Sequence, residues 1–167
     1  MDQKYKRYTQ TAVTVFIHHG DDYLLLLRDK NKSVDPVRLN GVGGRLELGE
    51  EYLTASVRET IEETGYKVTK EEMKFSGIVR LQDGYPEDWI MCYFTIEVSS
   101  KIIPHGNSTD DGELMWMSSK EVLSSDFKLV DNLHYCFEDI VKGNVFFLSC
   151  ILNTDHKIIQ HTKSYLE

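Results

Sequence analysis

The stretch GRLELGEEYLTASVRETIEETGY, residues 44–66, decides how the rest of this chain is interpreted. Six glutamates fall between positions 47 and 63, and the stretch holds only two arginines as basic residues. We predict that residues 51–64 form a helix and that Gly65 ends it, because glycine readily adopts the left-handed conformation that follows a last helical turn. So much negative charge on one helix needs a physical explanation.

On a helix with about 100° per residue, the three glutamates of the last two turns share one face. The opposite face is predicted to pack on a sheet and holds Leu53, Val57 and Ile61, with Thr60 and Thr64 near the same side. Glu59 and Glu63 are like charges one turn apart, which costs roughly 0.2–0.5 kcal/mol when they are exposed, and anions in the last turn oppose the helix dipole. A charged face is most often simply the solvated face, but this arrangement favours an external cation. Glu59, Glu62 and Glu63 together form a hard, oxygen-rich site suited to Mg²⁺ or Mn²⁺.

The composition is that of one globular domain spanning residues 1–167. The chain is 41% hydrophobic and 28% charged, and its formal net charge is −8. This acidic balance argues against a broad surface that follows the phosphates of DNA or RNA, so no nucleic-acid polymer is expected as a partner. A small anionic ligand remains compatible with it, provided that local Arg, Lys or metal ions supply positive charge.

The sequence also indicates in which compartment the protein acts. No apolar run reaches the roughly 20 residues of a membrane span, and the N-terminal MDQKYKRYTQ lacks the apolar stretch of a secretory signal. Three cysteines are widely spaced and form no metal-type pair: Cys92, Cys136 and Cys150. We therefore expect free thiols in a reducing cytoplasm and no membrane association.

Strand patterns surround the predicted helix. We expect strands at residues 11–18, 23–28, 74–81, 89–98, 113–117, 145–152 and 156–166. A short helix over 118–125 is predicted to begin with a capping box of Ser118 and Glu121. A second full helix is expected over 131–143, with Gly143 after its last turn. Strands mixed with two or three helices indicate an α/β or α+β domain with helices on the faces of a mixed sheet.

The charged and glycine residues of the opening stretch have a distinctive spacing: Gly44, five residues, Glu50, seven residues, Arg58-Glu59, two residues, Glu62-Glu63, one residue, Gly65. This pattern resembles the Nudix box and matches every charged and glycine position of that signature. Thr60 and Tyr66 occupy slots that are aliphatic in the signature, so we expect an adjusted core beside an intact site.

The resemblance implies the fold class α/β, as an α/β/α sandwich with a mixed sheet and a loop–helix–loop motif. It also implies hydrolysis of a nucleoside diphosphate linked to another group, with Mg²⁺ as cofactor and Mn²⁺ as a substitute. By the same resemblance the box glutamates, Glu59, Glu62 and Glu63, hold the metals and carry the catalysis, and Glu59 is the one expected to take a proton from the attacking water.

Other roles follow from position in the family pattern. Gly43 and Gly44 let the backbone approach the metal and the phosphates closely, while Glu50 and Arg58 pair to hold the loop against the helix. Arg28 ends a strand where family members often place a cation that reaches phosphate. Solvation is an equally good reading of it.

Glu113 stands where some Nudix enzymes carry a further metal-binding carboxylate, whereas Asp110 and Asp111 are read as plain loop acids. The six histidines are read as structural or surface residues.

The substrate is indicated less directly. LNGVGGRLELGE, residues 39–50, resembles the MutT-like branch that cleaves oxidised purine nucleoside triphosphates such as 8-oxo-dGTP, although Leu39 replaces the tryptophan common there. In part of that branch the asparagine, here Asn40, bonds the purine edge, and KLVDN places Asp131 and Asn132 near the same base. Asn40 as a turn residue and Asp131 as a helix N-cap are the competing readings.

ADP-ribose and dinucleoside polyphosphates stay open as substrates. A non-catalytic nucleotide-binding Nudix module is the rival from another class. The expected partner is a small nucleotide, and a homodimer is left open.

Overall fold

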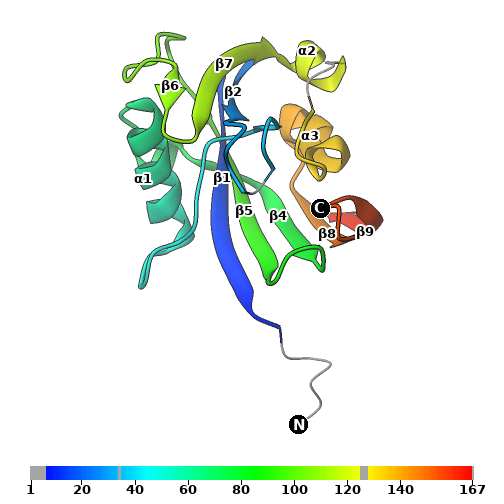
Figure 1. Cartoon of the computed structure of the whole chain (residues 1–167). Coiled ribbons are helices and arrows are strands. Elements are labelled where there is room, and N and C mark those ends of the chain that lie inside the picture. The colour runs from blue at the N-terminus through cyan, green and yellow to red at the C-terminus, as the bar shows by residue number, and fades with distance from the viewer. Residues whose placement is uncertain (1–6, 34, 125–127, 167) are drawn as a thin grey trace.

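The computed structural model describes residues 7–33, 35–124 and 128–166. In these ranges the strands form one nine-stranded mixed sheet in the order β6-β7-β2-β1-β5-β4-β8-β9, with β3 paired to β2 (Figure 1). The strands are β1 Thr9–His19, β2 Asp22–Arg28, β3 Leu39–Asn40, β4 Lys74–Gln82, β5 Asp88–Glu97, β6 Ser108–Thr109, β7 Gly112–Ser118, β8 Phe146–Leu152 and β9 Ile158–Tyr165. The pairs β1–β5 and β4–β8 are parallel, and the other pairs are antiparallel.

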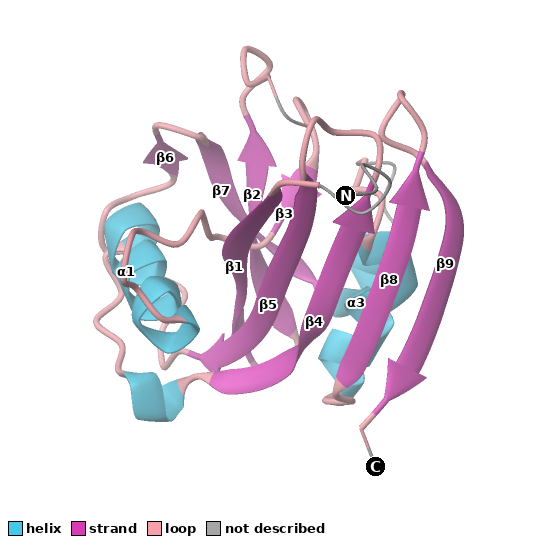
Figure 2. Ribbon diagram, turned by 90° about the horizontal axis from the view of Figure 1, so that it is seen from below, coloured by secondary structure: helices cyan, strands magenta, loops and turns pink. Residues whose placement is uncertain are grey.

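The helices cover both faces of this sheet. α1, Tyr52–Thr64, lies on one face, and α3, Leu133–Lys142, lies on the other (Figure 2). A short α2, Ser119–Ser124, lies near α3, and a single 3₁₀ turn covers Lys70–Glu72. The predicted α/β/α sandwich with a mixed sheet is therefore confirmed.

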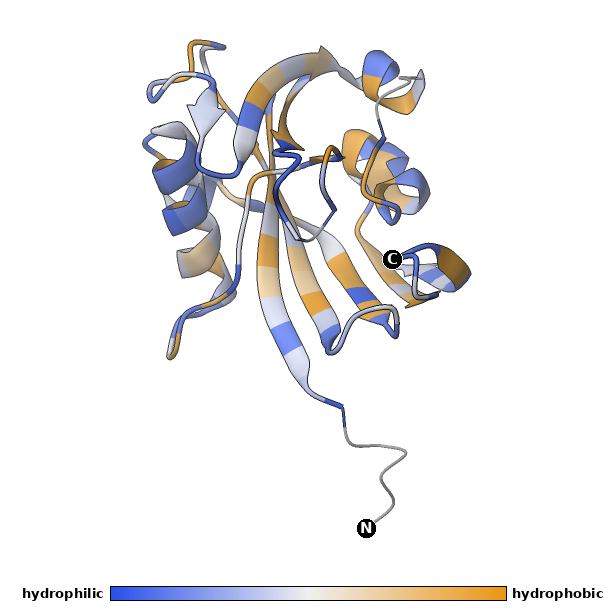
Figure 3. Cartoon of the chain, viewed as in Figure 1, coloured by the Kyte–Doolittle hydropathy of each residue, from blue (hydrophilic) through white to orange (hydrophobic). Residues whose placement is uncertain are grey.

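Two separate apolar clusters follow from the alternation of side chains along the strands. On the α3 face, Phe16 and Tyr93 pack with Phe137 of the helix, and the ring centroids of Phe16 and Phe137 are 6.0 Å apart. On the α1 face, Val13 and Val15 pack with Ala55 of the helix. Figure 3 shows apolar residues alternating with polar ones along β1, β4 and β5, and a hydrophilic C-terminal half of α1.

β1 and β2 pair over only three residue pairs, from His19–Asp22 to Ile17–Leu24, and then separate. The segment that follows β3 runs in the resulting gap along β1. The N–H of Val15 donates to the carbonyl of Val42 at 2.7 Å, and the N–H of Val13 donates to that of Gly44 at 2.9 Å. The glycine-rich segment 41–44 is therefore hydrogen-bonded alongside β1 like a strand, and it lies between the α1 face and the α3 face of the sheet.

Most predicted elements occur, with shifted ends. The capping box is present, because the N–H of Glu121 donates to Ser118 Oγ at 3.2 Å and the N–H of Ser118 donates to Glu121 Oε2 at 2.8 Å. The helix it begins is described to Ser124, and position 125 lies outside the described residues. α3 begins at Leu133, two residues later than predicted, and Gly143 follows it in the left-handed region.

No helix in the described part of the chain combines the length and the apolar character needed to cross a bilayer.

Candidate active site

α1 is held at both ends by local contacts. At its start, the Glu51 carboxylate accepts hydrogen bonds from the N–H groups of Leu53 and Thr54, at 3.1 and 2.9 Å, as a helix N-cap. At its end, Gly65 has a φ of 77° and its N–H donates to the carbonyl of Ile61. The helix begins and ends close to where the sequence predicts, so the glutamates occupy its last two turns.

The predicted packing face of α1 is confirmed in part. Leu53 and Val57 are partly buried against the apolar cluster, and Thr60 and Thr64 are fully buried, but Ile61 is 39% exposed. Ala55 and Glu59, which were predicted on the opposite side, are also buried. The helix is therefore turned so that its small residues and two of its glutamates face the sheet. The nearby glycine backbone accompanies this burial, because Gly44 lies against the Glu59 carboxylate and Gly43 donates a backbone hydrogen bond to Glu63.

Arg58 supplies part of the positive charge that the glutamates need. Its guanidinium bonds Glu50 through two nitrogens, at 2.8 and 2.9 Å, and its Nη1 also donates to Glu59 at 2.8 Å and to Glu62 at 3.1 Å. A further bond from Nη2 reaches the carbonyl of Arg45 at 3.2 Å. These contacts hold the pKa of Glu50 at about 2, chiefly through the hydrogen bond from Arg58.

Glu63 is in a different electrostatic position. Burial, followed by the charges of Glu59 and Asp111, raises its pKa to about 8, and a backbone hydrogen bond from Gly43 only partly opposes this. Its Oε2 atom is buried and has no hydrogen-bond partner. Burial also raises the pKa of Glu59, against the lowering effect of Arg58. A buried, unsatisfied carboxylate oxygen is costly unless a cation completes it.

The carboxylates line a cavity of about 360 Å³ together with the loop before β7. Glu59, Glu62 and Glu63 contribute from the helix, and Asp110 and Asp111 contribute from the turn between β6 and β7. Glu113 does not line this cavity, because it lies on β7 with an exposed side chain. The acids that the sequence reading set aside as plain loop residues therefore stand where Glu113 was expected.

The donor set of this cavity fits a hard divalent cation. It consists of carboxylate oxygens, and one of them is buried without a partner. Within the ranges that the structure describes, no three His, Cys, Asp or Glu side chains already converge as a metal-binding group. Arg58 bonds one carboxylate oxygen of Glu59, Oε1, and one of Glu62, Oε2.

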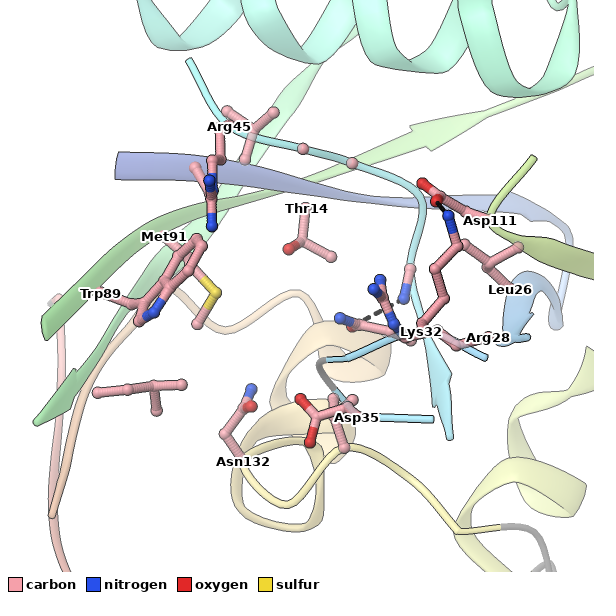
Figure 4. Close-up of a pocket in the computed structure, with 18 of the residues that line it drawn as sticks. Thr14, Leu26, Arg28, Lys32, Asp35, Arg45, Trp89, Met91, Asp111 and Asn132 are labelled. Atoms are coloured by element: carbon pink, nitrogen blue, oxygen red, sulfur yellow. Dashed lines mark hydrogen bonds and ion pairs between the residues drawn. The ribbon is translucent and has the colours of Figure 1, made fainter. Parts of the chain in front are cut away.

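A second cavity, of about 380 Å³, lies on the α3 face of the sheet. Figure 4 shows Arg28, Lys32 and Asp111 on one side of it. Arg45, Trp89 and Met91 lie on the other side, and Asp35 and Asn132 lie at the end away from α1. Lys32 forms an ion pair with Asp111. The cavity therefore has cations on two sides and polar groups at its inner end.

Asn40 and Asn132 both line this cavity. The Nδ2 of Asn132 donates to the buried Tyr93 hydroxyl at 2.6 Å, which turns the amide oxygen of Asn132 away from Tyr93. The Asn40 amide oxygen accepts a hydrogen bond from the N–H of Gly41 at 2.9 Å. Thr14, which also lines the cavity, bonds Tyr93 as well, so a small polar network lies at the floor.

Asp131 is not part of this group. Its carboxylate accepts from Lys157 Nζ at 3.0 Å and from the N–H of Ile158 at 2.8 Å, so it ties the start of β9 to the approach to α3. The residue before the first turn of α3 is Asn132, whose side chain makes no capping bond. Asp131 therefore neither lines the cavity nor caps the helix.

Gly43 and Gly44 connect the two cavities. Both line the cavity on the α3 face, yet a Cβ on Gly44 would collide with the carboxylate of Glu59, and Gly43 bonds Glu63. Gly43 has a φ of 155°, and a Cβ there would collide with the carbonyl of Val13. Asp111 lines both cavities. Only glycine at these two positions leaves backbone within reach of both sides.

Several residues of the site escape the sequence reading. Lys32, Asp35 and Tyr85 come from loops, Arg45 follows the glycine-rich segment, and Trp89 lies near the start of β5 beside the β4–β5 turn. None of them belongs to a motif. Asp110 and Asp111 stand just before a predicted strand, but a pair of acids in a polar loop does not by itself indicate a metal site.

The NUDIX domain model matches residues 8–138. The uncharacterized Nudix hydrolase YvcI of Bacillus subtilis (strain 168) is 28% identical over 114 residues, which are 66% of this chain and 67% of that protein.

Solved structures share the fold. A mutator MutT protein from Bacillus halodurans superposes with a TM-score of 0.77 and 19% identity, covering 93% of this chain and 97% of its own. A bifunctional NMN adenylyltransferase/ADP ribose pyrophosphatase from Francisella tularensis, solved with AMP and a manganese ion, has a TM-score of 0.62 and 21% identity over 83% of this chain and 42% of its own. At these identities the likeness concerns the fold alone.

Proposed function

This chain belongs to the Nudix hydrolase family, whose members are pyrophosphohydrolases acting on phosphorus-containing anhydrides, and we propose that its own substrate is a purine nucleoside triphosphate. The favoured base is an oxidised guanine, as in 8-oxo-dGTP, and the products are the nucleoside monophosphate and pyrophosphate. The observation that carries the proposal is the position of Gly43 and Gly44 between the carboxylate cavity and the cavity with Asn40 and Asn132. A triphosphate whose base occupied the second cavity would bring its anhydride bonds to the first.

Hydrogen-bonding groups support the proposed recognition of the base. Asn132 is 5% exposed, and Tyr93 fixes the orientation of its amide, so its oxygen is set to accept a bond from a base. A fixed polar group of this kind discriminates strongly, because a base that cannot pair leaves it unsatisfied. Asn40 supplies a second amide beside the phosphate-binding backbone.

Charged side chains support the proposed binding of the triphosphate. Arg28 and Lys32 line the same cavity and would neutralise part of the triphosphate. Mg²⁺ is the proposed cofactor, held by Glu59, Glu62 and Glu63, with Asp111 as a candidate neighbour in place of Glu113. When bound, such an ion polarises the anhydride and makes a water more acidic. Gly43 contributes backbone groups at the same point.

The proton of the attacking water needs an acceptor among these residues. Glu59 is the family expectation, but Arg58 holds its Oε1 at 2.8 Å. Glu63 has a pKa raised to about 8 and an unpartnered oxygen, and its deprotonated form could accept the proton once the cavity is neutralised. We therefore keep both as candidates for the general base.

A reducing cytoplasm as the place of action belongs to the same proposal. Support comes from Cys92, Cys136 and Cys150, which are all buried free thiols.

The test is a panel of 8-oxo-dGTP, dGTP, ADP-ribose and a dinucleoside tetraphosphate, incubated with Mg²⁺ and analysed for all products. Release of pyrophosphate and a monophosphate, fastest from 8-oxo-dGTP, is the expected result. Faster cleavage of ADP-ribose to AMP and ribose 5-phosphate would move the assignment to another substrate class. No cleavage of any compound would favour a binding role.

A further inference from the structure

Trp89 is the least explained aromatic residue of the second cavity. It lies on β5 and is half-buried. It lines the cavity together with Met91 of the same strand (Figure 4) and Leu81 of the neighbouring β4. An indole set beside apolar side chains at a cavity wall offers a flat surface to a ligand. The chain has only one other tryptophan, Trp116, whose Nε1 donates to the carbonyl of Lys101 away from this cavity.

The face of the Trp89 ring is covered by a group that is weakly held. The guanidinium of Arg45 lies 5.0 Å from the centre of the ring. The side chain of Arg45 is 59% exposed, and its ion pair with Glu87 is long, at 4.0 Å. The backbone of Arg45, in contrast, is fixed by the bond from Arg58 to its carbonyl and by pairing with Ala12 of β1. The side chain can therefore leave the ring without disturbing the main chain.

Tyr85, the other aromatic ring of the cavity, has no such surface to offer. Its ring is stacked on His156 with centroids 4.1 Å apart, and its hydroxyl bonds Asp35 at 3.3 Å. Both its face and its hydroxyl are therefore already occupied by neighbouring side chains. Trp89 is thus the aromatic ring of this cavity whose cover is a solvent-exposed, loosely paired cation.

We propose that Trp89 is the stacking surface for the aromatic base of the substrate, and that the base takes the place of the Arg45 guanidinium on the ring. The inference rests on the proposed function in taking a nucleotide as the substrate. Stacking of a base on an aromatic ring is stronger than an exposed cation–π contact, so the exchange favours the bound nucleotide. The released guanidinium stays beside the phosphate-binding backbone, where an anion attracts it.

Recognition of the base would then depend on two kinds of contact, one with its edge and one with its face. Asn132 reads the edge of the base, and Trp89 holds its face whichever base is present. Loss of Trp89 should therefore weaken binding of all nucleotides, and purines more than pyrimidines because the larger ring overlaps more of the indole. Loss of Asn132 should change the order of preference among bases instead.

The experiment uses the two tryptophans. In a Trp116→Phe variant, Trp89 is the sole tryptophan, and its fluorescence reports the ring directly. Titration with dGMP should quench this fluorescence, and 2-deoxyribose 5-phosphate, which has the sugar and phosphate without the base, should not. The matched Trp89→Phe variant keeps only Trp116 and should show no quenching with either compound.

Kinetics give the second measurement. Trp89→Leu should lower kcat/KM for the hydrolysed nucleotide on the order of tenfold, mainly through KM, while Trp89→Phe keeps most of it. Melting curves of both variants check that they are folded. Equal quenching by the two titrants, or an unchanged kcat/KM in folded Trp89→Leu, would overturn the stacking role. Quenching by dGMP in a protein that cleaves no triphosphate would support the stacking role and reject the proposed reaction.

Discussion

Arg58 donates two parallel hydrogen bonds to Glu50, from Nε to Oε1 at 2.8 Å and from Nη2 to Oε2 at 2.9 Å. The bonds join the loop before α1 to the middle of the helix, eight residues later in the chain. The same guanidinium also contacts Glu59 and Glu62, so one residue fixes the loop and orients two carboxylates of the cavity. Loss of the Arg58–Glu50 pair should therefore affect both the stability of the protein and the positions of the carboxylates.

Glu50→Gln should lower stability in a pH-dependent way. The pKa of Glu50 is about 2 in the folded protein against an ordinary value of 4.5, so the unfolded chain binds the extra proton between these values. Its contribution is complete above about pH 4.5 and disappears as the pH falls towards 2. The melting-temperature difference between wild type and Glu50→Gln should therefore shrink across this window.

Glu97→Gln, which removes an exposed carboxylate at the end of β5, is the matched control. A difference for Glu50→Gln that stays constant down to pH 3 would show that the charge of Glu50 does not matter.

Glu63→Gln should lower kcat by orders of magnitude at saturating Mg²⁺ while the fold remains intact. The substitution is close in shape and removes the charge of the carboxylate whose Oε2 is buried without a partner. Steady-state hydrolysis and circular dichroism of the same preparation are the measurements. Near-normal turnover would remove Glu63 from the catalytic group.

The same substitution should stabilise the protein in a chelator. Burial raises the pKa of Glu63 to about 8, so the folded protein holds a proton that the unfolded chain has released above about pH 4.5. Wild-type stability should then fall as the pH rises from 4.5 through 8, and Glu63→Gln should lack this loss. Thermal melting in EDTA at pH 5 and pH 8 compares the two, and a larger loss in the variant would contradict the assignment.

Mg²⁺ should raise the melting temperature of the wild-type protein. A ligand that binds only the folded state adds about 2.7 kcal/mol at a hundredfold excess over its Kd, or roughly 5–10 °C for a chain of this length. Most of the shift should disappear in Glu63→Gln. Sodium chloride at matched ionic strength is the control, and an unchanged melting temperature up to millimolar Mg²⁺ would count against the carboxylate cavity as a metal site.

Asn132→Ala and Asn40→Ala should change the ratio of kcat/KM between 8-oxo-dGTP and dGTP. Loss of one bond from a fixed amide to a base is worth roughly 1–3 kcal/mol, or about 5- to 150-fold. Asp131→Ala should leave the ratio unchanged and lower the melting temperature, because its carboxylate bonds Lys157 and Ile158. Ratios equal to wild type in both asparagine variants would exclude them as base readers.

The carboxylate helix could be predicted from the sequence because its signals are local. Residue spacing identified the glutamates, Gly65 marked the end of the helix, and the Ser118–Glu121 box was visible as a short pattern. Helical periodicity correctly predicted that Leu53, Val57, Thr60 and Thr64 face the sheet, but it also placed Ile61 inside and Ala55 and Glu59 outside. Glu59 lies against the backbone of Gly44, which reaches the helix only through the tertiary fold.

The second cavity could not be predicted for a related reason. Asp35, Trp89 and Asn132 are far apart in the chain and meet only because β5, α3 and the loop after β2 converge. Asp131 and Asn132 are adjacent, and the family resemblance led us to predict Asp131 as the base-reading residue, whereas Asn132 is the one that lines the cavity. The structure separates them, since Asp131 turns to β9 while Asn132 bonds Tyr93.

The early separation of β1 and β2 has a consequence for how such a protein changes over generations. The partition between the two cavities is main chain, residues 41–44, and it belongs to neither group of side chains. Trp89 and Asn132 can be exchanged on one face of the sheet without moving a carboxylate of α1 on the other. On the proposed function, substitutions on the α3 face would alter which base is accepted while the carboxylates of α1 are inherited unchanged.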